Sequence, residues 1–487
     1  MPARKIGLPP DVPPDLARGL AALRATLEVP ADFDPAVTAA AEQAAARPRL
    51  PDLDRTDLAL ITIDPPGSRD LDQAMHIERR GSGYLVSYAI ADVAAFVTAG
   101  DPIDLEAHRR GETMYAPDRR TPLHPPALSE GAASLLPGQV RPALLWSLTL
   151  DAGGQMTDAT VARARVRSQE QLDYGQAQTE IDGGAPRTTL ALLAEIGPKR
   201  EQRERDRGGV SLQIPEQEIV PPGDDAPPGA ATTGDQGWRL AFRAPLPVEG
   251  WNAQISLLTG MAAAHIMLYG QVGIVRTMPP ADQGSLRRLR QTAKALAIDW
   301  PAELDYPEFV RSLDPAKPAE AAMMNACTML FRGAGYQAFS GSVPEHPEHS
   351  ALAIDYAHVT APLRRLVDRY AGEVCLALCA DQPVPDWVLR ALDALPDEMA
   401  GADRRAKKYE RAIIDLMEVC LLAGRVGERF RATIVEVDKD HRRGVAMIAD
   451  PAVEATVRGA DLPLGQQTTV ELASADFATG AVAFTLA

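Results

Sequence analysis

Apolar residues recur at helical spacing near the start of the chain. The residues that define this face are Leu16, Leu20, Leu23 and Leu27. Steps of three and four residues place side chains on one face of an α-helix. A second, Ala-rich helix is predicted to open at Asp34 and Pro35 and to end before Pro48. Residues 1–50 therefore form a helical arm, which either touches nucleic acid as a helix-turn-helix unit or simply packs on the protein.

From Leu58 the pattern changes to a short apolar run, LALITID, that ends at Asp64 and meets the turn-forming residues 65–67. Such a run indicates a buried strand that enters a tight loop. Residues 75–78 and 84–90 then flank a glycine-containing turn, which predicts a hairpin. The loop between Asp64 and the hairpin is therefore anchored by sheet at both ends, and it can hold side chains in a fixed geometry.

The middle of the chain is predicted to be mostly helical. Residues 251–268 are apolar on nearly every face, which is typical of a helix at the centre of a large domain. A later apolar stripe predicts another helix that ends near Gly424; its members are Tyr409, Ile413, Leu416 and Cys420. Residues 221–237 are rich in Pro, Gly and Asp, and they indicate an exposed connector.

Beyond residue 426 the pattern is entirely of the β type, with five short strands in about 60 residues. Five strands at this length favour an OB-fold barrel, which either binds oligonucleotides on its strand face or serves only as structure. Phe430 and Phe477 are its candidate stacking aromatics. The expected fold class is α+β, with the arm at 1–50, a catalytic domain at 51–425 and the barrel at 426–487.

Composition limits the possible functions. The 487 residues carry a formal net charge of -16, which argues against a polybasic binder that relies on a chain-wide cationic field. Four cysteines are too few for a disulfide framework and suit a reducing compartment. The first residues lack the apolar core of a signal peptide, and no run of about 18 apolar residues occurs. We therefore expect a cytoplasmic protein that does not enter a membrane.

The candidate chemistry lies in the loop after the first strand, where Asp64, Asp70 and Asp72 fall within nine residues and Gln73 follows. Carboxylates this close repel one another, and few cations stand near them in the sequence. A divalent cation would relieve the repulsion, so the cluster indicates a hard-oxygen site for Mg²⁺ or Mn²⁺. The spacing does not fit an EF-hand. An Asp-rich turn that caps backbone amides is the alternative.

Four segments, in the same order, resemble the RNB catalytic domain of the ribonuclease II and ribonuclease R family. They are TIDPPGSRDLDQA (62–74), YLVSYAIADVAAFV (84–97), TMYAPDRRTPLHPPALSEGAASLLPG (113–138) and YAHVTAPLRRLVDRYAG (356–372). The resemblance spans about residues 50 to 425. It implies a monomeric exonuclease that hydrolyses single-stranded RNA, or RNA with a 3′ overhang, processively from the 3′ end with Mg²⁺ and releases nucleoside 5′-monophosphates. The preference for RNA over DNA rests on this resemblance alone.

The resemblance also assigns roles within the acidic loop. Asp64, Asp70 and Asp72 become metal ligands or water-orienting bases. The family motif usually ends in two consecutive aspartates, and Gln73 takes the second place here. An amide oxygen can ligate Mg²⁺ but brings neither charge nor basicity. A catalytically impaired RNA-binding or regulatory protein with the same fold is therefore the alternative function.

The remaining site residues also come from the resemblance. Arg364 matches the arginine that grips the scissile phosphate, and Arg365 and His358 lie in the same block as candidate RNA contacts. Tyr115 matches the tyrosine that stacks on the terminal base, and Tyr174 resembles a second tyrosine of the RNA channel. The alternatives are a surface arginine, a packed histidine and core tyrosines. Gln254 is a loose match to the family's glutamate on the central helix.

Overall fold

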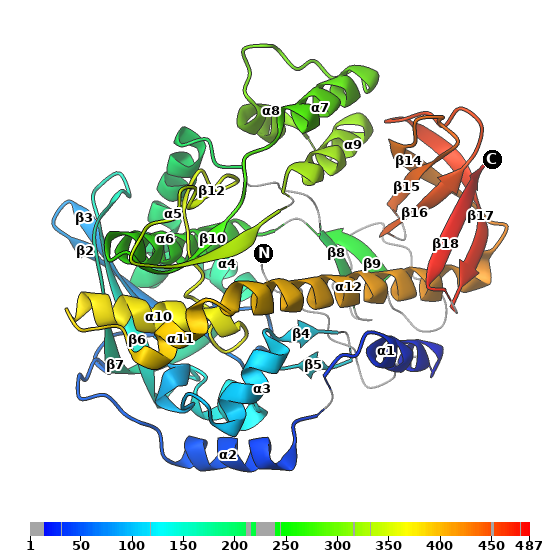
Figure 1. Cartoon of the computed structure of the whole chain (residues 1–487). Helices are drawn as coiled ribbons and strands as arrows, with labels where there is room; N and C mark the ends of the chain where they lie inside the picture. Colours follow the sequence, from blue (N-terminus) through cyan, green and yellow to red (C-terminus); the bar gives the residue numbers. More distant parts are fainter. Residues whose placement is uncertain are drawn as a thin grey trace.

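The computed structural model describes most of the chain. The described residues are 14–30, 32–116, 118–210, 216–220, 239–243, 245–314, 317–331, 333–449, 452–477 and 479–487. The connector expected at 221–237 lies outside them. The described part contains two closed barrels joined by a largely helical region (Figure 1).

The first barrel holds the acidic loop. Its strands are β1 (Leu60–Asp64), β2 (Gln73–Arg80), β3 (Gly83–Ala91), β6 (Val140–Leu150) and β7 (Met156–Asp173). β1 runs parallel to β7, and the other neighbours are antiparallel. The predicted strand and hairpin are confirmed, with Arg80 opposite Gly83 at the turn. Gly83 has to be a glycine because a Cβ there would lie 2.0 Å from the Leu150 carbonyl oxygen.

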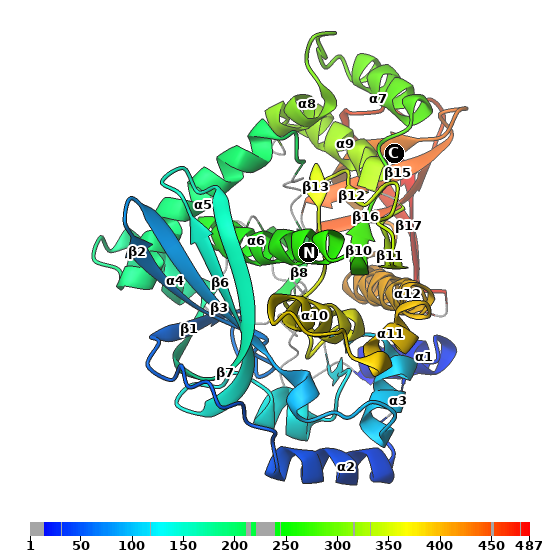
Figure 2. The same ribbon diagram turned by 60° about the vertical axis from the view of Figure 1, so that its left-hand side comes forward.

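Helices cover one side of this barrel (Figure 2). They are α4 (Tyr174–Asp182), α5 (Thr188–Asp206), α6 (Pro247–Tyr269) and α10 (Leu366–Cys379). The shorter α11 (Asp386–Leu392) packs on α10. The central helix expected at 251–268 is confirmed as α6, which packs between α5 and α10. Gly260 lets the 356–365 segment approach α6, because a Cβ there would overlap the ring of Tyr356.

Shorter elements complete the helical region. The strands are β4 (Met114–Tyr115), β5 (Arg120–Thr121), β8 (Glu216–Val220), β9 (Arg239–Arg243), β10 (Val272–Thr277), β11 (Gly335–Ser340), β12 (Glu348–His349) and β13 (Ile354–Asp355). The helices are α3 (Pro102–Arg110), α7 (Gln283–Ala295), α8 (Tyr306–Ser312) and α9 (Pro318–Cys327). No helix in the described part of the chain is both long and apolar enough to cross a membrane.

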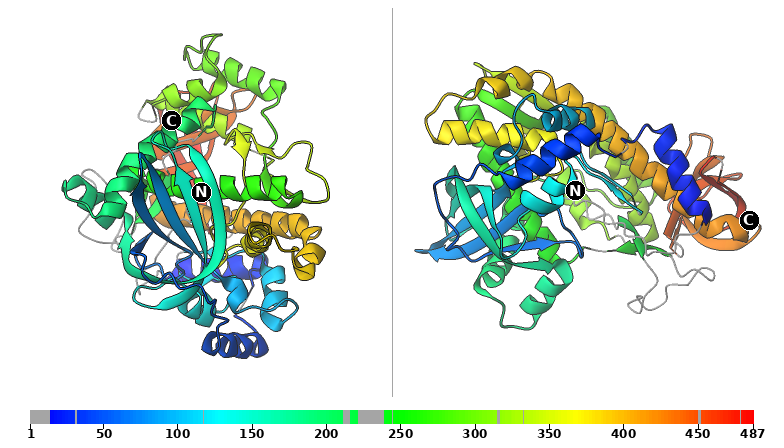
Figure 3. Two further views of the ribbon diagram at one scale, coloured as in Figure 1. Left: turned by 90° about the vertical axis from the view of Figure 1, so that its left-hand side faces the viewer. Right: turned by 90° about the horizontal axis from the view of Figure 1, so that it is seen from below.

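The two helices of the arm pack on different parts of the protein (Figures 1 and 3). α1 (Pro14–Thr26) lies along α12 (Leu395–Leu422) and buries Leu16 and Leu20 there. α2 (Pro35–Ala46) is capped by Asp34, whose Oδ1 accepts from the amide of Ala36 at 2.8 Å, and it rests on α3. These contacts are packing contacts, and a role in nucleic-acid binding stays a prediction.

The second barrel has the OB topology expected from the sequence. Its strands are β14 (Arg429–Val437), β15 (Arg443–Ala449), β16 (Ala452–Arg458), β17 (Gln467–Asp476) and β18 (Ala481–Leu486). The closed order β14-β15-β16-β18-β17 includes one parallel pair, β16 with β18. α12 carries the predicted apolar stripe, ends at Leu422 and leads into this barrel.

One expectation for this barrel is wrong. Phe430 was a candidate for stacking on RNA bases, but strand alternation points it inward, where it is 6% exposed and meets Phe484 edge to face. Phe477 is exposed, as a stacking residue must be. An RNA-binding role for this barrel therefore has one candidate aromatic rather than two.

Candidate active site

The acidic loop joins the end of β1 to the start of β2 and is fixed from outside by a serine. The Leu71 amide donates to Ser134 Oγ at 2.9 Å, and Ser134 Oγ donates to the Arg69 carbonyl at 2.6 Å. Leu71 itself is fully buried. This anchoring holds the carboxylates on either side of Leu71 in defined positions.

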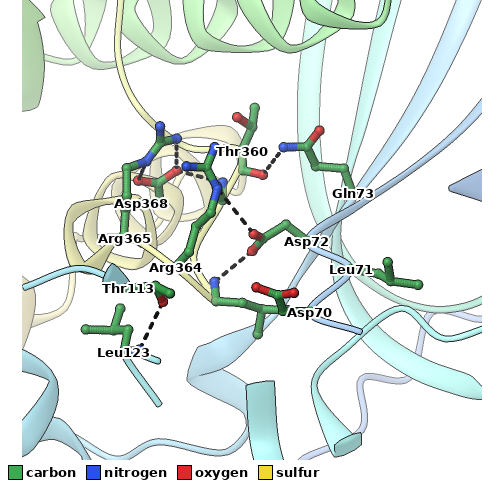
Figure 4. A network of polar contacts seen from close by, with 12 residues as sticks. Asp70, Leu71, Asp72, Gln73, Thr113, Leu123, Thr360, Arg364, Arg365 and Asp368 are labelled. Atoms are coloured by element: carbon green, nitrogen blue, oxygen red, sulfur yellow. Dashed lines mark hydrogen bonds and ion pairs between the residues drawn. The ribbon is translucent and has the colours of Figure 1, made fainter. Parts of the chain in front are cut away.

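Asp72 contacts the turn that carries Arg364, some 290 residues later (Figure 4). Its Oδ1 accepts from the backbone amide of Leu363 at 2.7 Å, and its Oδ2 lies 3.8 Å from Arg364 Nε. Asp72 is only 5% exposed, and burial raises its pKa well above the ordinary value despite the Arg364 charge and the Leu363 hydrogen bond. The predicted meeting of the acidic loop with Arg364 therefore occurs at Asp72.

Asp70 is neutralised by a cation that was not expected. Arg120 on β5 forms an ion pair with Asp70 and a second one with Glu130 at 3.1 Å. The loop is short of cations in the sequence, but Arg120 lies 50 residues away and is brought in by the fold. Asp70 in turn raises the pKa of Asp72, so the two carboxylates share one electrostatic environment.

Asp64 stands at the end of β1 on the side of two tyrosines. Burial is the main cause that raises the pKa values of Tyr88 and Tyr174. The negative charge of Asp64 raises both pKa values further. The pKa of Tyr174 rises to about 12. Tyr174 also hydrogen-bonds the side chain of Asn252 on α6. Asp64 therefore borders the same site from the β1 edge.

These carboxylates suit an open site for a divalent cation. Within the described ranges, no group of three His, Cys, Asp or Glu side chains could hold a metal ion by itself. Mg²⁺ is usually held by one or two carboxylates, and water and substrate phosphates complete its shell. Asp70 and Asp72, with mutually unfavourable charges and hard oxygen donors, fit that kind of site rather than a closed protein cage.

Gln73 lies beside Asp72 and is engaged on both ends of its amide. Its Nε2 donates to the Thr360 carbonyl at 2.7 Å. Its Oε1 lies 2.5 Å from the Tyr88 hydroxyl and 3.2 Å from Ser256 Oγ, and the two hydroxyls are 2.8 Å apart. The amide therefore joins β2 to β3, to α6 and to the turn of Arg364.

Arg365 and His358 make contacts within the protein. Arg365 donates twice to the Asp368 carboxylate, at 2.8 and 2.7 Å, and its side chain is 14% exposed. His358 Nδ1 lies 2.7 Å from the Tyr336 hydroxyl, and the ring packs edge to face against Tyr336 and Tyr356. These contacts agree with a packed histidine, and RNA contact by either residue stays a prediction.

Tyr115 lies at the site on β4. The pKa of its hydroxyl is raised by burial and then by Asp70, while Arg364 lowers it. The neighbouring Thr113 amide donates to the Arg364 carbonyl at 2.9 Å, so this strand is tied to the arginine turn. Gln254 is elsewhere: its Nε2 donates to Glu204 at 2.5 Å in the buried contact between α6 and α5.

Two family models match this chain. A model of the RNB domain matches residues 53–377. The chain belongs to the RNB domain family. A model of the RNase II-type exonuclease C-terminal S1 domain matches residues 428–487, which is the second barrel of this RNB protein.

Relatives of this RNB protein include Ribonuclease R of Escherichia coli K12, 25% identical over 422 residues that cover 79% of this chain and 48% of the relative. The Exosome complex exonuclease RRP44 homolog A of Arabidopsis thaliana is 26% identical over 377 residues, covering 74% of this chain and 39% of the relative. The chain thus spans about half the length of these relatives, or less.

Solved structures share the fold. Mycoplasma genitalium RNase R, in complex with ribose-methylated single-stranded RNA, matches with a TM-score of 0.83 and 18% identity, covering 97% of this chain and 78% of the other. Yeast Ssd1, described as a pseudonuclease, matches with a TM-score of 0.67 and 17% identity, covering 85% and 51%. At these identities the likeness establishes the architecture and leaves the chemistry to the residues.

Several residues of the RNB site were missed in the sequence. Arg120 stands in the matched segment 113–138, yet nothing in its spacing indicates that it meets Asp70. Tyr88 and Ser256 complete the surroundings of Gln73, and Asn252 borders Tyr174. The available signals were the place of Tyr88 in the matched segment 84–97 and the proximity of Asn252 and Ser256 to the loosely matched Gln254 on α6.

Glu112 provides a test of the electrostatics beside the arginine turn. Burial raises its pKa to about 7, Asp403 adds to the rise, and Arg365 and Arg364 oppose it. A carboxyl in the unfolded chain ionises near 4.5, so the folded state binds the extra proton between these values. The stability that this proton contributes is therefore lost as the pH rises towards 7.

We expect Glu112→Gln to stabilise the protein by up to about 3 kcal/mol at pH 8 and to give much less gain at pH 5. Urea unfolding at the two pH values measures this difference. Glu345→Gln, at a side chain 91% exposed, controls for the change in net charge. An equal gain at both pH values would mean that Glu112 is ionised in the folded state throughout.

Proposed function

We propose that this RNB protein is an exoribonuclease that degrades RNA processively from its 3′ end to nucleoside 5′-monophosphates, with Mg²⁺ or Mn²⁺. The observation that carries the proposal is the contact of Asp72 with the Leu363 amide and Arg364. It brings acid and cation from opposite parts of the sequence to one place, where an anionic phosphodiester can be both bound and attacked. The names of the curated relatives support the same activity.

The arginine and the aspartates of the site are proposed to have different roles in hydrolysis. Arg364 presents a planar array of N–H donors that suits the equatorial oxygens of a scissile phosphate. Asp70 and Asp72, with Asp64 at the β1 edge, hold the divalent cation or orient the attacking water. When bound, the cation neutralises phosphate charge and lowers the pKa of that water.

Tyrosines on both sides of the acidic loop are proposed to receive the RNA. The charges of Asp70 and Arg364 act on Tyr115, and the charge of Asp64 acts on Tyr174. Stacking of a base on a tyrosine is worth about 1–3 kcal/mol and tolerates every base, as sequential hydrolysis requires. We propose single-stranded RNA, or RNA with a 3′ overhang, as the substrate of a monomeric, cytoplasmic enzyme.

The second candidate function is RNA binding without efficient hydrolysis. It is favoured by Gln73, which stands where the family usually has a second aspartate and leaves the loop with one carboxylate fewer. The structural likeness to yeast Ssd1, a pseudonuclease, is compatible with this alternative. Both functions use the same site residues, so binding measurements do not distinguish them.

A time course on uniformly labelled RNA distinguishes the two functions. We expect mononucleotides to accumulate from RNA with a free 3′ end, with few intermediates, when Mg²⁺ is present. EDTA, a 3′-phosphate block and a DNA oligomer of the same sequence are the controls. Binding of the RNA without any product, with either Mg²⁺ or Mn²⁺, would favour the non-catalytic alternative.

A further inference from the structure

Gln73 occupies the position in the acidic motif where the resemblance predicts a metal ligand, and its contacts define a different role. The Thr360 carbonyl can only accept a hydrogen bond, so it fixes which end of the Gln73 amide faces it. Nε2 must point to Thr360, and Oε1 must point to the hydroxyls of Tyr88 and Ser256. The oxygen that could ligate a metal is therefore turned towards two hydroxyl groups.

Gln73 and Asp72 together complement the backbone of the arginine turn. Asp72 accepts from the Leu363 amide, and Gln73 donates to the Thr360 carbonyl, so adjacent side chains hold both ends of the segment just before Arg364. Figure 4 shows Gln73 beside Thr360 and Asp72 beside Arg364. Thr360 is buried, so water cannot easily replace a lost donor there.

An aspartate at position 73 would not make these contacts. It is one methylene shorter and has no N–H group, and it would place a negative charge against the Thr360 carbonyl. It would also place a second carboxylate next to that of Asp72, which is itself buried. The surroundings of position 73 favour a neutral donor over a carboxylate.

We propose that Gln73 is a positioning residue that holds the turn of Arg364 against the acidic loop, and that it is not a metal ligand. Its amide links β2 to the 360–365 turn, and the Tyr88 and Ser256 hydroxyls keep that amide oriented. The glutamine that replaces the family's usual aspartate then supports the position of the turn, and its presence does not weaken the metal site. The kinetic part of this inference rests on the proposed function; its metal-binding and stability parts do not.

Gln73→Asp and Gln73→Glu test the proposal in the full chain. Calorimetric titration with Mg²⁺ alone is expected to give an affinity within about twofold of the parent for both variants. The midpoint temperature of thermal unfolding is expected to fall by about 3 °C in both variants, because the buried Thr360 carbonyl loses its hydrogen-bond donor. Gln171→Glu is the matched control, since Gln171 Nε2 donates to the Ser68 carbonyl of the same loop at 2.8 Å without contacting the arginine turn.

A double-mutant cycle separates positioning from general destabilisation. Gln73→Glu should lower kcat/KM on RNA about 100-fold in the parent and only about threefold in the Arg364→Ala background, because a misplaced turn matters only while it carries the arginine. Gln171→Glu should show no such dependence. If the parent protein does not hydrolyse RNA, the same cycle is measured on the affinity for RNA with a 3′-hydroxyl end. Failure of the proposed enzymatic function therefore leaves this test intact.

Two outcomes would overturn the inference. One is a Mg²⁺ affinity of Gln73→Asp that is at least tenfold higher than that of the parent, which would make position 73 a ligand position. The other is an equal loss from Gln73→Glu with and without Arg364, which would mean that the amide does not act through the turn. Coupled losses with unchanged Mg²⁺ affinity would support it.

Discussion

Replacing Asp72 by asparagine is expected to lower mononucleotide release about 1000-fold, equivalent to about 4 kcal/mol of transition-state stabilisation. Asp72 is the carboxylate that contacts the arginine turn, and asparagine keeps the shape while removing the charge and the basicity. The asparagine oxygen can still accept from the Leu363 amide, so the fold should persist. Initial rates on labelled RNA with saturating Mg²⁺ measure the effect.

The thermal midpoint of Asp72→Asn is expected to equal or exceed that of the parent at pH 8. A buried carboxylate is costly, which is why burial raises the pKa of Asp72, and the neutral amide avoids that cost. The combination of lost activity and undiminished stability identifies a residue kept for chemistry. Retention of more than a tenth of the parent rate would remove Asp72 from the reaction.

Replacing Arg364 by alanine is expected to lower kcat/KM by about 100-fold to 1000-fold. The guanidinium stands 3.8 Å from the Asp72 carboxylate, and its proposed role is to bind the scissile phosphate. Arg364→Lys should recover only a small part of the loss, because an ammonium group cannot bind phosphate oxygens in a fork. Steady-state kinetics on an RNA oligomer measure both variants.

Two other arginines make this test specific. Arg109→Ala removes a side chain that is 59% exposed and pairs with Glu106, and it should leave kcat/KM unchanged. Arg365→Ala breaks a buried pair with Asp368 and is expected to reduce stability by several kcal/mol before any effect on chemistry is visible. Equal kinetic losses in Arg364→Ala and Arg109→Ala would contradict a specific role for Arg364.

The sequence was a good guide wherever neighbouring residues decide the structure. The apolar run into Asp64, the hairpin after it and the all-round apolar helix α6 were confirmed because strand and helix periodicities are local properties. The C-terminal barrel followed from five regularly spaced strands. The prediction that Phe430 is exposed for stacking was wrong, because strand spacing alone does not say which face of a strand points into the barrel.

The sequence by itself determined the elements, the acidic loop and the family resemblance that pointed to Arg364. Tertiary structure alone decided which distant groups meet: Arg120 forms an ion pair with Asp70, and Gln73 donates to the Thr360 carbonyl. The physical reason is that ion pairs and side-chain hydrogen bonds act over a few ångströms, whereas the partners are separated by up to 287 residues of chain. Only the packing of β4, β5 and the 360–365 turn around the first barrel brings them together.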